Sequence, residues 1–390
     1  MHLRGLIRNP VATSCPHNAM ERFARCAGLD DMNHTRRRLI ACLPLICASA
    51  TSSKLRAQSV PDTDLAQIEA AVRRQARVST FILFQADRVR LEYYAKGRSF
   101  ERAINIKSAS KSVLNALTGI AVERGDVKSL DTPISAFLPQ YFSTFAKSDR
   151  RREITIRHLV SMSSGLPSTS IYNYGAWVSS RDWVAYALNQ KLEHSPGERM
   201  TYSTGDTHLL AAVLTKAAGV PLRTYAQKHL FDPLDVQIGG WDRDPQGNYF
   251  GGNNLALSPK ALLAFGCLYL DGGVFNGKRV LTQAWIKESW TPRFFNSSYN
   301  ARHDSGYLWW HTKFAGQSTW FAWGYGGQFL FVVPATDAVV VFTGNPDATS
   351  RGGNTEIYGL MDETIVPYLS KVQTTSATEV SRATQVPSVR

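Results

Sequence analysis

The sequence predicts an α/β (α+β) fold in which an antiparallel sheet is flanked by helices and interrupted by an inserted, mainly helical domain. Three observations predict this arrangement. Strand-like apolar segments occur near both ends of the 390-residue chain, between residues 81 and 94 and again after residue 306. The segment between them shows helical periodicity with frequent Pro and Gly punctuation. Neither end has enough strands for a stable sheet, so we expect both ends to pair in one sheet.

The individual elements follow from local patterns. Residues 64–77 place apolar side chains on one face of a predicted helix. Residues 81–84 and 89–94 alternate around a Gln-Ala-Asp turn, which predicts a β-hairpin. A second amphipathic helix begins near Ser108 and stops before Gly125. Toward the C-terminus we expect strands at 307–311, 320–323, 329–333 and 338–343, and then a helix over 355–369.

These elements predict how the chain divides into domains. We expect a discontinuous α/β domain from residues 62–128 and 300–370, with residues 129–299 forming the inserted helical domain. Residues 1–58 are expected to be a leader that is disordered or cleaved, and residues 371–390 a disordered polar tail. A catalytic cleft is expected between the two domains, where pockets usually form.

The leader has the features of an export signal. From Met32 the chain carries three consecutive arginines, then an apolar run over residues 39–50 that ends in small residues. This run is too short to span a bilayer, so we expect no stable membrane anchor. The arginines also resemble a twin-arginine signal. We therefore expect translation to start at Met32 and the protein to be periplasmic or secreted. Four of the five cysteines lie in this leader, so the mature chain keeps Cys267.

Composition excludes several classes of function. The formal net charge is +13, but nine of the 44 Lys and Arg residues lie in residues 1–57 and the others are scattered. No basic stripe is interleaved with aromatic residues, so we expect no nucleic-acid partner. The nine histidines are dispersed and no cluster has metal-ligand spacing. We therefore expect no metal and no cofactor.

A Ser-x-x-Lys sequence marks the start of the second predicted helix. It reads Ser108-Ala109-Ser110-Lys111 and places the serine and the lysine one turn apart on the same face. An ammonium beside a hydroxyl stabilises the developing alkoxide and can shuttle its proton. The helix N-terminus adds partial positive charge near the same oxygen. Read alone, the motif fits a catalytic nucleophile and an ordinary N-cap followed by a solvated lysine equally well.

Further segments favour the nucleophile. Residues 195–206 read Ser-Pro-Gly-Glu-Arg-Met-Thr-Tyr-Ser-Thr-Gly-Asp and start a helix, and residues 321–328 read Phe-Ala-Trp-Gly-Tyr-Gly-Gly-Gln and enter a strand. Together with the Ser-Met-Ser-Ser-Gly-Leu-Pro sequence at 161–167, they resemble the serine β-lactamase-related, penicillin-binding-protein-like hydrolase family. Residues 251–258, 306–310 and 324–328 are similar to its 6-aminohexanoate-dimer hydrolase branch. The resemblance covers residues 64–370 in order and implies a serine β-lactamase-like fold.

The resemblance implies a role for each residue of the catalytic group. Ser108 would attack a carbonyl group and form an acyl-enzyme. Lys111 would lower the pKa of Ser108 and of Tyr202, because a nearby cation favours the ionised forms. Tyr202 would act as the general base and then return the proton to the leaving group; the alternative is that it is a core aromatic residue.

The same resemblance suggests residues for the rest of the site. The backbone N–H groups of Ser108 and Gln328 would form the oxyanion hole, and Gly326 and Gly327 would let the strand approach the substrate. Tyr172 and Tyr174 either line the pocket or simply pack. Glu198 resembles a deacylating base, but we interpret it as a structural partner of the turn before Tyr202.

Two departures from the family pattern bear on the substrate. Thr204 stands where the second box often has Asn, which keeps a hydroxyl and loses an amide. Tyr325 stands where β-lactamases and peptidases have Lys or His, the cation that recognises a substrate carboxylate. We therefore expect an exported serine hydrolase that cleaves a small amide or ester through an acyl-enzyme, similar to 6-aminohexanoate-oligomer hydrolases.

Two alternatives to this function stay open. One is an esterase, or a β-lactamase or DD-peptidase, of the tyrosine-base type. The other is a non-catalytic binding or sensor protein of the cell envelope, against which the intact Ser108, Lys111 and Tyr202 argue.

Overall fold

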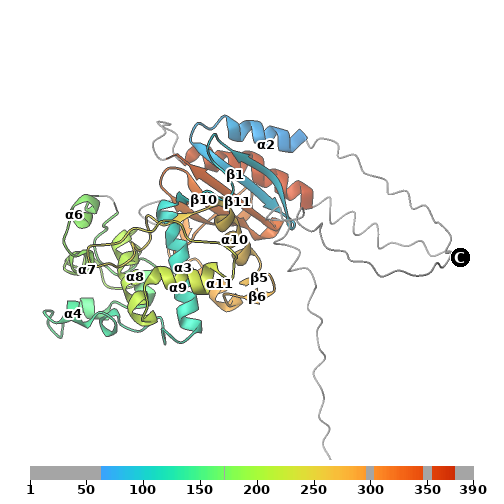
Figure 1. Ribbon diagram of the computed structural model, residues 1–390. Coiled ribbons are helices and arrows are strands. Elements are labelled where there is room, and N and C mark those ends of the chain that lie inside the picture. Colours follow the sequence, from blue (N-terminus) through green and yellow to red (C-terminus); the bar gives the residue numbers. More distant parts are fainter. Residues whose placement is uncertain (1–62, 171, 296–302, 346–353, 374–390) are drawn as a thin grey trace, which may run out of the picture.

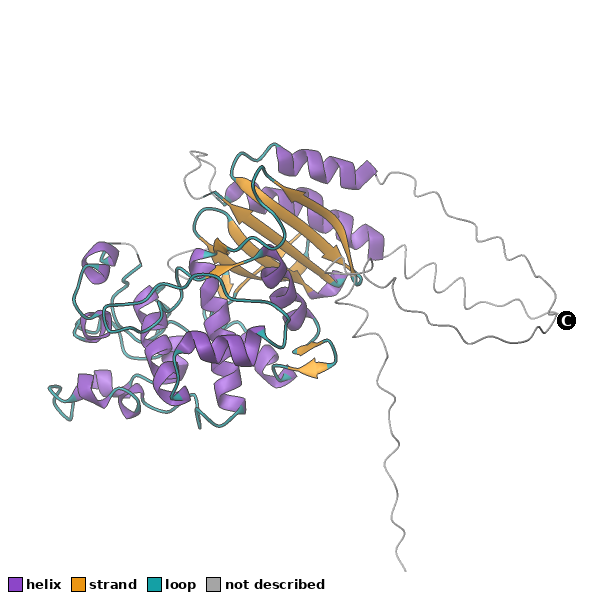
Figure 2. Ribbon diagram, in the orientation of Figure 1, coloured by secondary structure: helices purple, strands orange, loops and turns teal. Residues whose placement is uncertain are grey.

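An antiparallel sheet organises the computed structural model, which describes residues 63–170, 172–295, 303–345 and 354–373. Within these residues, seven strands pair in the order β2-β1-β11-β10-β9-β8-β7 (Figure 2). Their bounds are β1 Val78–Gln85, β2 Arg88–Tyr94, β7 Asp304–Ser305, β8 Trp310–Phe314, β9 Gln317–Gly324, β10 Gln328–Val333 and β11 Ala338–Gly344. The two ends of the chain therefore meet in one sheet, as the sequence predicted.

The centre of the sheet is where the first and last strands pair. All eight residues of β1 and all seven of β11 are buried, and Phe81 lies opposite Phe342 in the antiparallel register. Such continuous apolar runs are expected for strands that are covered on both faces. β2 lies at the sheet edge and alternates charged and apolar residues, so half of its surface can face water.

Helices cover both faces of the sheet (Figure 1). α10 packs on β1, β10 and β11, whereas α2 packs on β1 and β2. Lys371, in the C-terminal helical segment, forms an ion pair with Asp64 of α2, at 2.6 Å. The helix bounds are α2 Thr63–Arg73, α3 Ser110–Glu123, α4 Pro139–Phe142, α5 Ile156–Val160, α6 Tyr174–Val178, α7 Trp183–Leu188, α8 Thr204–Ala218, α9 Leu222–Ala226, α10 Pro259–Leu270, α11 Gln283–Ser289 and α12 Thr355–Leu360.

Helix α3 connects the sheet to the helical region. It begins after the short 3₁₀ turn η1 (Lys107–Ala109), which contacts β9 and β10, and it packs against α8 farther along. Its residues 110–121 are all buried. A helix that is buried on every side belongs to the core of a large domain. The N-terminus of α3 therefore lies where the sheet and the helical region meet, which Figure 1 shows.

Several local predictions differ from the structure. The first helix ends at Arg73, because the chain turns before β1 begins at Val78. The predicted strand over 307–311 is wrong at its start: β8 begins at Trp310, and Leu308 has a positive φ of 55°. Tyr307 and Trp309 are buried aromatic residues in this turn, so their apolar character reflects core packing rather than strand pairing.

The middle of the chain also contains short pairings that its composition did not predict. β3 (Ile104–Asn105) pairs with β4 (Ala256–Leu257), and β5 (Val274–Phe275) pairs with β6 (Lys278–Arg279). The C-terminal helix includes a π-helical turn at Met361–Ile365 and continues to residue 373. The predicted leader and the rest of the predicted tail lie outside the described residues, and the domain boundaries stay predictions. No helix in the described ranges is long and apolar enough to cross a membrane.

Candidate active site

The turn that carries Ser108 is held in a strained conformation. Lys107, the residue before it, has a φ of 52°, which is uncommon for a residue with a Cβ. Two hydrogen bonds hold this turn: the Lys107 N–H donates to Asn105 Oδ1 at 2.8 Å, and the Ser110 hydroxyl donates to the Lys107 carbonyl at 2.7 Å. Backbone strain of this kind is found at functional sites, where the surrounding structure holds it in place. Ser108 is half-buried at the start of α3.

Lys111 lies one turn after Ser108 and uses its three donor positions inside the protein. Its Nζ donates to Ser108 Oγ at 3.3 Å, to Thr204 Oγ1 at 3.2 Å and to the carbonyl oxygen of Gly252 at 2.8 Å. The side chain is 3% exposed. The interpretation of Lys111 as a solvated lysine is therefore wrong.

Burial changes the protonation of this amine. Because the charged form loses its hydration, burial lowers the pKa of Lys111 to about 7. An amine with a pKa near 7 is partly unprotonated at neutral pH, so it can accept a proton, which is the property a general base needs. Both the geometry and the protonation of Lys111 therefore suit proton transfer with Ser108.

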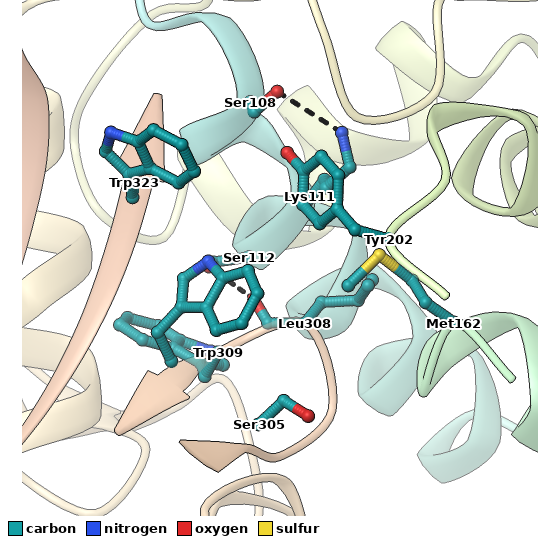
Figure 3. A pocket seen from close by; sticks show the side chains of 10 residues that line it. Ser108, Lys111, Ser112, Met162, Tyr202, Ser305, Leu308, Trp309 and Trp323 are labelled. Carbon is teal, nitrogen blue, oxygen red and sulfur yellow. Dashed lines mark hydrogen bonds between the residues drawn. The ribbon is translucent and has the colours of Figure 1, made fainter. Parts of the chain in front are cut away.

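Tyr202 comes from the helical region and faces the same point. Its ring stacks on Trp310 with centroids 5.9 Å apart, and Lys111 Nζ lies 4.9 Å from the ring centroid. Figure 3 shows its hydroxyl directed toward Ser108 and the Lys111 amine. The structure therefore brings together the three residues that the sequence singled out.

The start of α8 is fixed by a loop of serine and threonine side chains, and this loop also fixes Tyr202. Ser170 Oγ accepts from the Thr204 N–H at 2.8 Å, and Thr169 Oγ1 accepts from the Gly205 N–H at 2.6 Å. These bonds satisfy N–H groups that a helix N-terminus leaves without intrahelical partners. The Ser168 hydroxyl donates to the carbonyl of Tyr202 at 2.7 Å. No motif in the sequence predicted that residues 168–170 cap α8.

At Gly324, strand β9 approaches the turn that carries Ser108. A Cβ on this residue would overlap the carbonyl oxygen of Ile106 and would lie 3.1 Å from the Ala109 nitrogen. The absence of a side chain therefore lets the end of β9 pack directly on the backbone of the Ser108 turn. Trp323 and Tyr325, on either side of Gly324, both line the cavity beside Ser108.

Two cavities open at Ser108. The larger one has a volume of about 280 Å³. It is lined by Lys107, Ser108, Ser170, Tyr174, Tyr202, Thr204, Asn253, Trp323 and Tyr325. The smaller one, of about 10 Å³, lies on the other side of the catalytic group against Met162, Leu308 and Trp309 (Figure 3). The larger cavity suits a small molecule, and it contains no carboxylate among its lining residues.

Other residues that the sequence assigned to the site lie elsewhere. The Gln328 side chain donates to the Gly344 carbonyl at 2.8 Å and accepts from the Gly344 N–H at 3.2 Å, so it belongs to the sheet interior. Gly326 packs on Gly344, and Gly327 lies beside Arg77. None of these three lines either cavity. The glycines, with φ of 84° and 86°, form the turn between β9 and β10, and the close approach to Ser108 occurs at Gly324 instead.

Of the two tyrosines suggested for the pocket, one lies in it and the other does not. Tyr174 lines the larger cavity and accepts a hydrogen bond from Asn253 Nδ2 at 3.3 Å, whereas Tyr172 is 96% exposed and lines neither cavity. Glu198 is exposed and accepts from the Ser195 N–H at 2.9 Å, as expected for a partner of that turn.

Four further groups at the site had no role predicted from the sequence: the Gly252 carbonyl, Ser170, Asn253 and Trp323. Gly252 and Asn253 did belong to a segment that carried the family resemblance. In the part of the chain that the structure describes, no group of three or more His, Cys, Asp or Glu residues could hold a metal ion.

Comparison with known proteins agrees with this geometry. The sequence pattern of the beta-lactamase family matches residues 101–359, well over half of the chain. The 6-aminohexanoate-dimer hydrolase of Paenarthrobacter ureafaciens is 23% identical over 298 residues, which cover 70% of this chain and 74% of that protein.

Solved structures share the fold. A D-stereospecific amidohydrolase from a Streptomyces species matches with a TM-score of 0.58 and 17% identity, over 76% of this chain and 97% of that one. The hydrolase EstCE1, described as having promiscuous acyltransferase activity, matches with a TM-score of 0.63 and 19% identity, over 79% and 100%. These likenesses confirm the predicted fold class and the resemblance to the serine β-lactamase-related family. The chain belongs to the beta-lactamase family and is a serine hydrolase related to 6-aminohexanoate-dimer hydrolase.

Proposed function

We propose that this protein cleaves a small amide or ester through an acyl-enzyme formed on Ser108. The observation that carries the proposal is the buried Lys111 amine, 3.3 Å from Ser108 Oγ and beside Tyr202, at the wall of a cavity of about 280 Å³. A structural lysine has no reason to be buried next to a serine in a cavity, because burial of its charge is costly.

Acylation follows from this arrangement. Ser108 Oγ attacks the carbonyl carbon of the substrate, and its proton passes to the Lys111–Tyr202 pair. The bond between the carbonyl carbon and the leaving nitrogen or oxygen then breaks, and Tyr202 returns the proton to that atom. Water attacks the resulting ester on Ser108, which releases the acid and restores the serine. Because the lysine and tyrosine protons are coupled, the active form is the pair that lacks one proton.

The backbone N–H groups of Ser108 and Tyr325 are the donors we propose for the oxyanion. Tyr325 takes the place that the sequence analysis gave to Gln328, because Gly324 is the residue that touches the Ser108 turn. Donors that are fixed in place before the reaction stabilise the negative charge that develops on the carbonyl oxygen.

The lining of the cavity suggests an uncharged amide or ester group as the site of cleavage. Tyr174, Trp323 and Tyr325 supply aromatic surface, and Ser170 and Asn253 supply hydrogen-bonding groups. Tyr325 presents no cation to the cavity, so the contact by which β-lactamases and peptidases would recognise a substrate carboxylate is missing at that position; Lys107 of the η1 turn is the cation among the lining residues. A linear amide oligomer, like the substrate named for the Paenarthrobacter relative, is one candidate.

We also propose that the protein is exported to the periplasm or secreted through the signal near Met32. The proposal is supported by the three arginines followed by an apolar run over residues 39–50. N-terminal sequencing of the protein from the periplasm or medium should give a chain that begins after residue 50. A chain that begins at Met1 and stays in the cytoplasm would contradict it.

The catalytic proposal is tested with a fluorophosphonate probe and a substrate panel. The wild type should be labelled, Ser108→Ala should not, and Ser143→Ala should be labelled like the wild type because Ser143 is exposed and its hydroxyl only donates to the Gln140 carbonyl. p-Nitrophenyl esters and aminohexanoate dimers should be turned over faster than nitrocefin. Labelling that persists in Ser108→Ala, or a wild type that resists the probe and every substrate, would overturn the proposal.

A further inference from the structure

A buried histidine, His208, lies one turn into α8 behind the catalytic group. The residue has no exposed surface, and its ring is surrounded by Trp177, Trp183 and Phe250, with centroids 5.3 to 6.0 Å away. A polar ring in such a setting must have both nitrogens satisfied by hydrogen bonds. The mechanism proposed above does not use this residue.

The hydrogen bonds of His208 define its tautomer. Nδ1 lies 3.2 Å from the Gly251 nitrogen and accepts that backbone N–H. Nδ1 therefore carries no proton, and the ring is neutral with its proton on Nε2. Nε2 donates to Asp244 Oδ2 at 3.0 Å.

Asp244 is in turn held as a carboxylate. Its Oδ1 accepts the Asn248 backbone N–H at 2.7 Å, and its Oδ2 accepts from Asn248 Nδ2 at 2.8 Å. Burial raises the pKa of Asp244, but the hydrogen bonds from His208 and Asn248 outweigh it and leave the pKa below its ordinary value. The carboxylate thus fixes the proton of His208 on Nε2.

The residues that His208 holds reach the catalytic lysine. Gly251 packs so closely on α8 that a Cβ would overlap the Thr207 carbonyl, and the Thr207 hydroxyl donates to the Gly251 carbonyl at 3.1 Å. The next residue, Gly252, has a φ of 73° and turns its carbonyl oxygen to Lys111 Nζ, at 2.8 Å. This is the shortest of the three hydrogen bonds made by that amine.

We propose that Asp244 and His208 are positioning residues, which hold the segment Gly251–Gly252 so that the Gly252 carbonyl fixes the Lys111 amine against Ser108. The inference rests on the role proposed for Lys111. The acceptor at Gly252 occupies one donor of the amine and thereby directs another at Ser108 Oγ. It also favours the charged form, so it opposes the effect of burial. Among the titratable side chains of the described residues, Tyr202 has its ring centroid 4.9 Å from the Lys111 amine, Lys107 lines the same cavity as Ser108 and Tyr202, and Asp244 bonds to His208.

The tautomer is tested first, by ¹⁵N NMR of the wild type labelled at its histidine rings. The ring ¹⁵N signals of His208 are those that are missing from the spectrum of His208→Asn. At pH 7 these signals should be those of a neutral ring with its proton on Nε2. A signal from the Nδ1–H tautomer or from imidazolium would overturn the inference. This measurement does not depend on activity, so it stays informative even if the proposed function fails.

Asp244→Asn tests the connection to the lysine. The amide nitrogen introduced at position 244 is a donor and cannot face the Asn248 backbone N–H, so it must face Nε2 of His208. Nε2 then has to accept, and the ring proton moves to Nδ1. There it opposes the Gly251 N–H, which in the wild type donates to Nδ1. We expect the rate of inactivation by a fluorophosphonate at least tenfold lower, and the apparent pKa of its pH profile lower than in the wild type, because Lys111 loses its carbonyl partner. An unchanged pH profile in folded Asp244→Asn would contradict the inference.

Two substitutions of the histidine separate positioning from bulk. His208→Asn places an acceptor near the position of Nδ1, and His208→Gln places a donor near the position of Nε2. Both remove the ring from the same aromatic surroundings. The fluorophosphonate should inactivate His208→Asn at least three times faster than His208→Gln. The reason is that the Asn side-chain oxygen can still accept the Gly251 N–H, and this hydrogen bond orients Gly252. Equal rates, or a faster Gln variant, would refute the positioning role.

The control is Gln85→Met, which removes a buried amide that donates to the carbonyls of Thr336 and Leu369 in the sheet. This variant should be less stable to urea while its inactivation rate and pH profile stay those of the wild type. If Gln85→Met shifts the profile as Asp244→Asn does, the shift reports general destabilisation and the positioning role is wrong.

Discussion

In water a lysine side chain stays protonated up to about pH 10, but the surroundings of Lys111 remove that preference. The Lys111 side chain is only 3% exposed, and the three partners of its amine are two hydroxyls and a carbonyl rather than a carboxylate. The pKa of Lys111 therefore falls to about 7. Acylation should increase with pH through this value, because the Lys111–Tyr202 pair must lose one proton to accept that of Ser108.

Lys111→Arg tests this requirement. The guanidinium keeps the positive charge and the hydrogen-bonding capacity, but it stays protonated at every accessible pH. We expect the acylation rate to fall by roughly 10³-fold between pH 5 and 9, in the range that loss of a proton acceptor produces. Stopped-flow acylation by a p-nitrophenyl ester measures it. An Arg variant with more than a tenth of the wild-type rate would show that positive charge alone is sufficient.

The three residues that we propose to be catalytic could be singled out from the sequence because they are side chains of specific chemical types. Ser108, Lys111 and Tyr202 stood in recognisable motifs, and the structure brings them together. The Gly252 carbonyl could not be found in this way, since every residue has a carbonyl and only the fold decides where it points. The same limit explains why the resemblance suggested the Gln328 N–H as an oxyanion donor: a motif does not show where the turn between β9 and β10 places each backbone N–H.

At the scale of elements, the contact between β9 and the η1 turn positions Ser108, the proposed nucleophile. Gly324→Ala should push β9 away from Ile106, because a Cβ there overlaps the Ile106 carbonyl oxygen. We expect a loss of stability of about 2 kcal/mol, as overpacking produces, and an acylation rate at least 10²-fold lower, because one oxyanion donor is displaced. Urea unfolding and ester acylation measure the two effects.

Gly359→Ala is the matched control for this substitution. Gly359 lies in α12, where a Cβ would meet no atom within 4 Å. This variant should keep the wild-type acylation rate and be slightly more stable, because alanine favours a helix. If both alanine variants acylate at the wild-type rate, the β9 contact does not position the oxyanion donors.

Elements were predictable where their periodicity was strong. The hairpin of β1 and β2 and the strands β9 to β11 lie within a few residues of their predicted positions. The start of β8 was not predictable, because Tyr307 and Trp309 are apolar for a different reason: they fill the core beside α10 and α11. Apolar character alone does not separate a strand from a buried turn.

At the scale of the whole molecule, two buried ionisable groups flank the junction of sheet and helices. Burial lowers the pKa of Lys111 to about 7, and burial also raises the pKa of Asp206 to about 7, against the opposing hydrogen bonds from Ser164. The Asp206 carboxyl accepts the Ser164 hydroxyl at 2.8 Å. Burial disfavours the charged form of each group, so each one lowers the free energy of unfolding at the pH values where the unfolded chain would carry that charge.

The two groups act on stability in opposite directions. Between about pH 4 and pH 7 the folded protein keeps a proton on Asp206 that the unfolded chain has lost, so stability falls as pH rises. Between pH 7 and about pH 10 the unfolded chain keeps a proton on Lys111 that the folded protein has lost, so stability rises with pH. Their summed contribution to the free energy of unfolding therefore has its minimum near pH 7.

Two single substitutions should separate these two limbs. Asp206→Asn should remove the fall between pH 4.5 and 7, and Lys111→Met should remove the rise between pH 7 and 9. Each difference from the wild type should change on the order of 2 to 3 kcal/mol across its window, which corresponds to about two pKa units. Urea unfolding at half-unit intervals of pH measures the free energy of each variant against the wild type, so that titration of all other groups cancels. If the Lys111→Met difference stays constant from pH 7 to 9, Lys111 is protonated throughout, and the amine cannot be the neutral-pH proton acceptor that acylation of Ser108 requires.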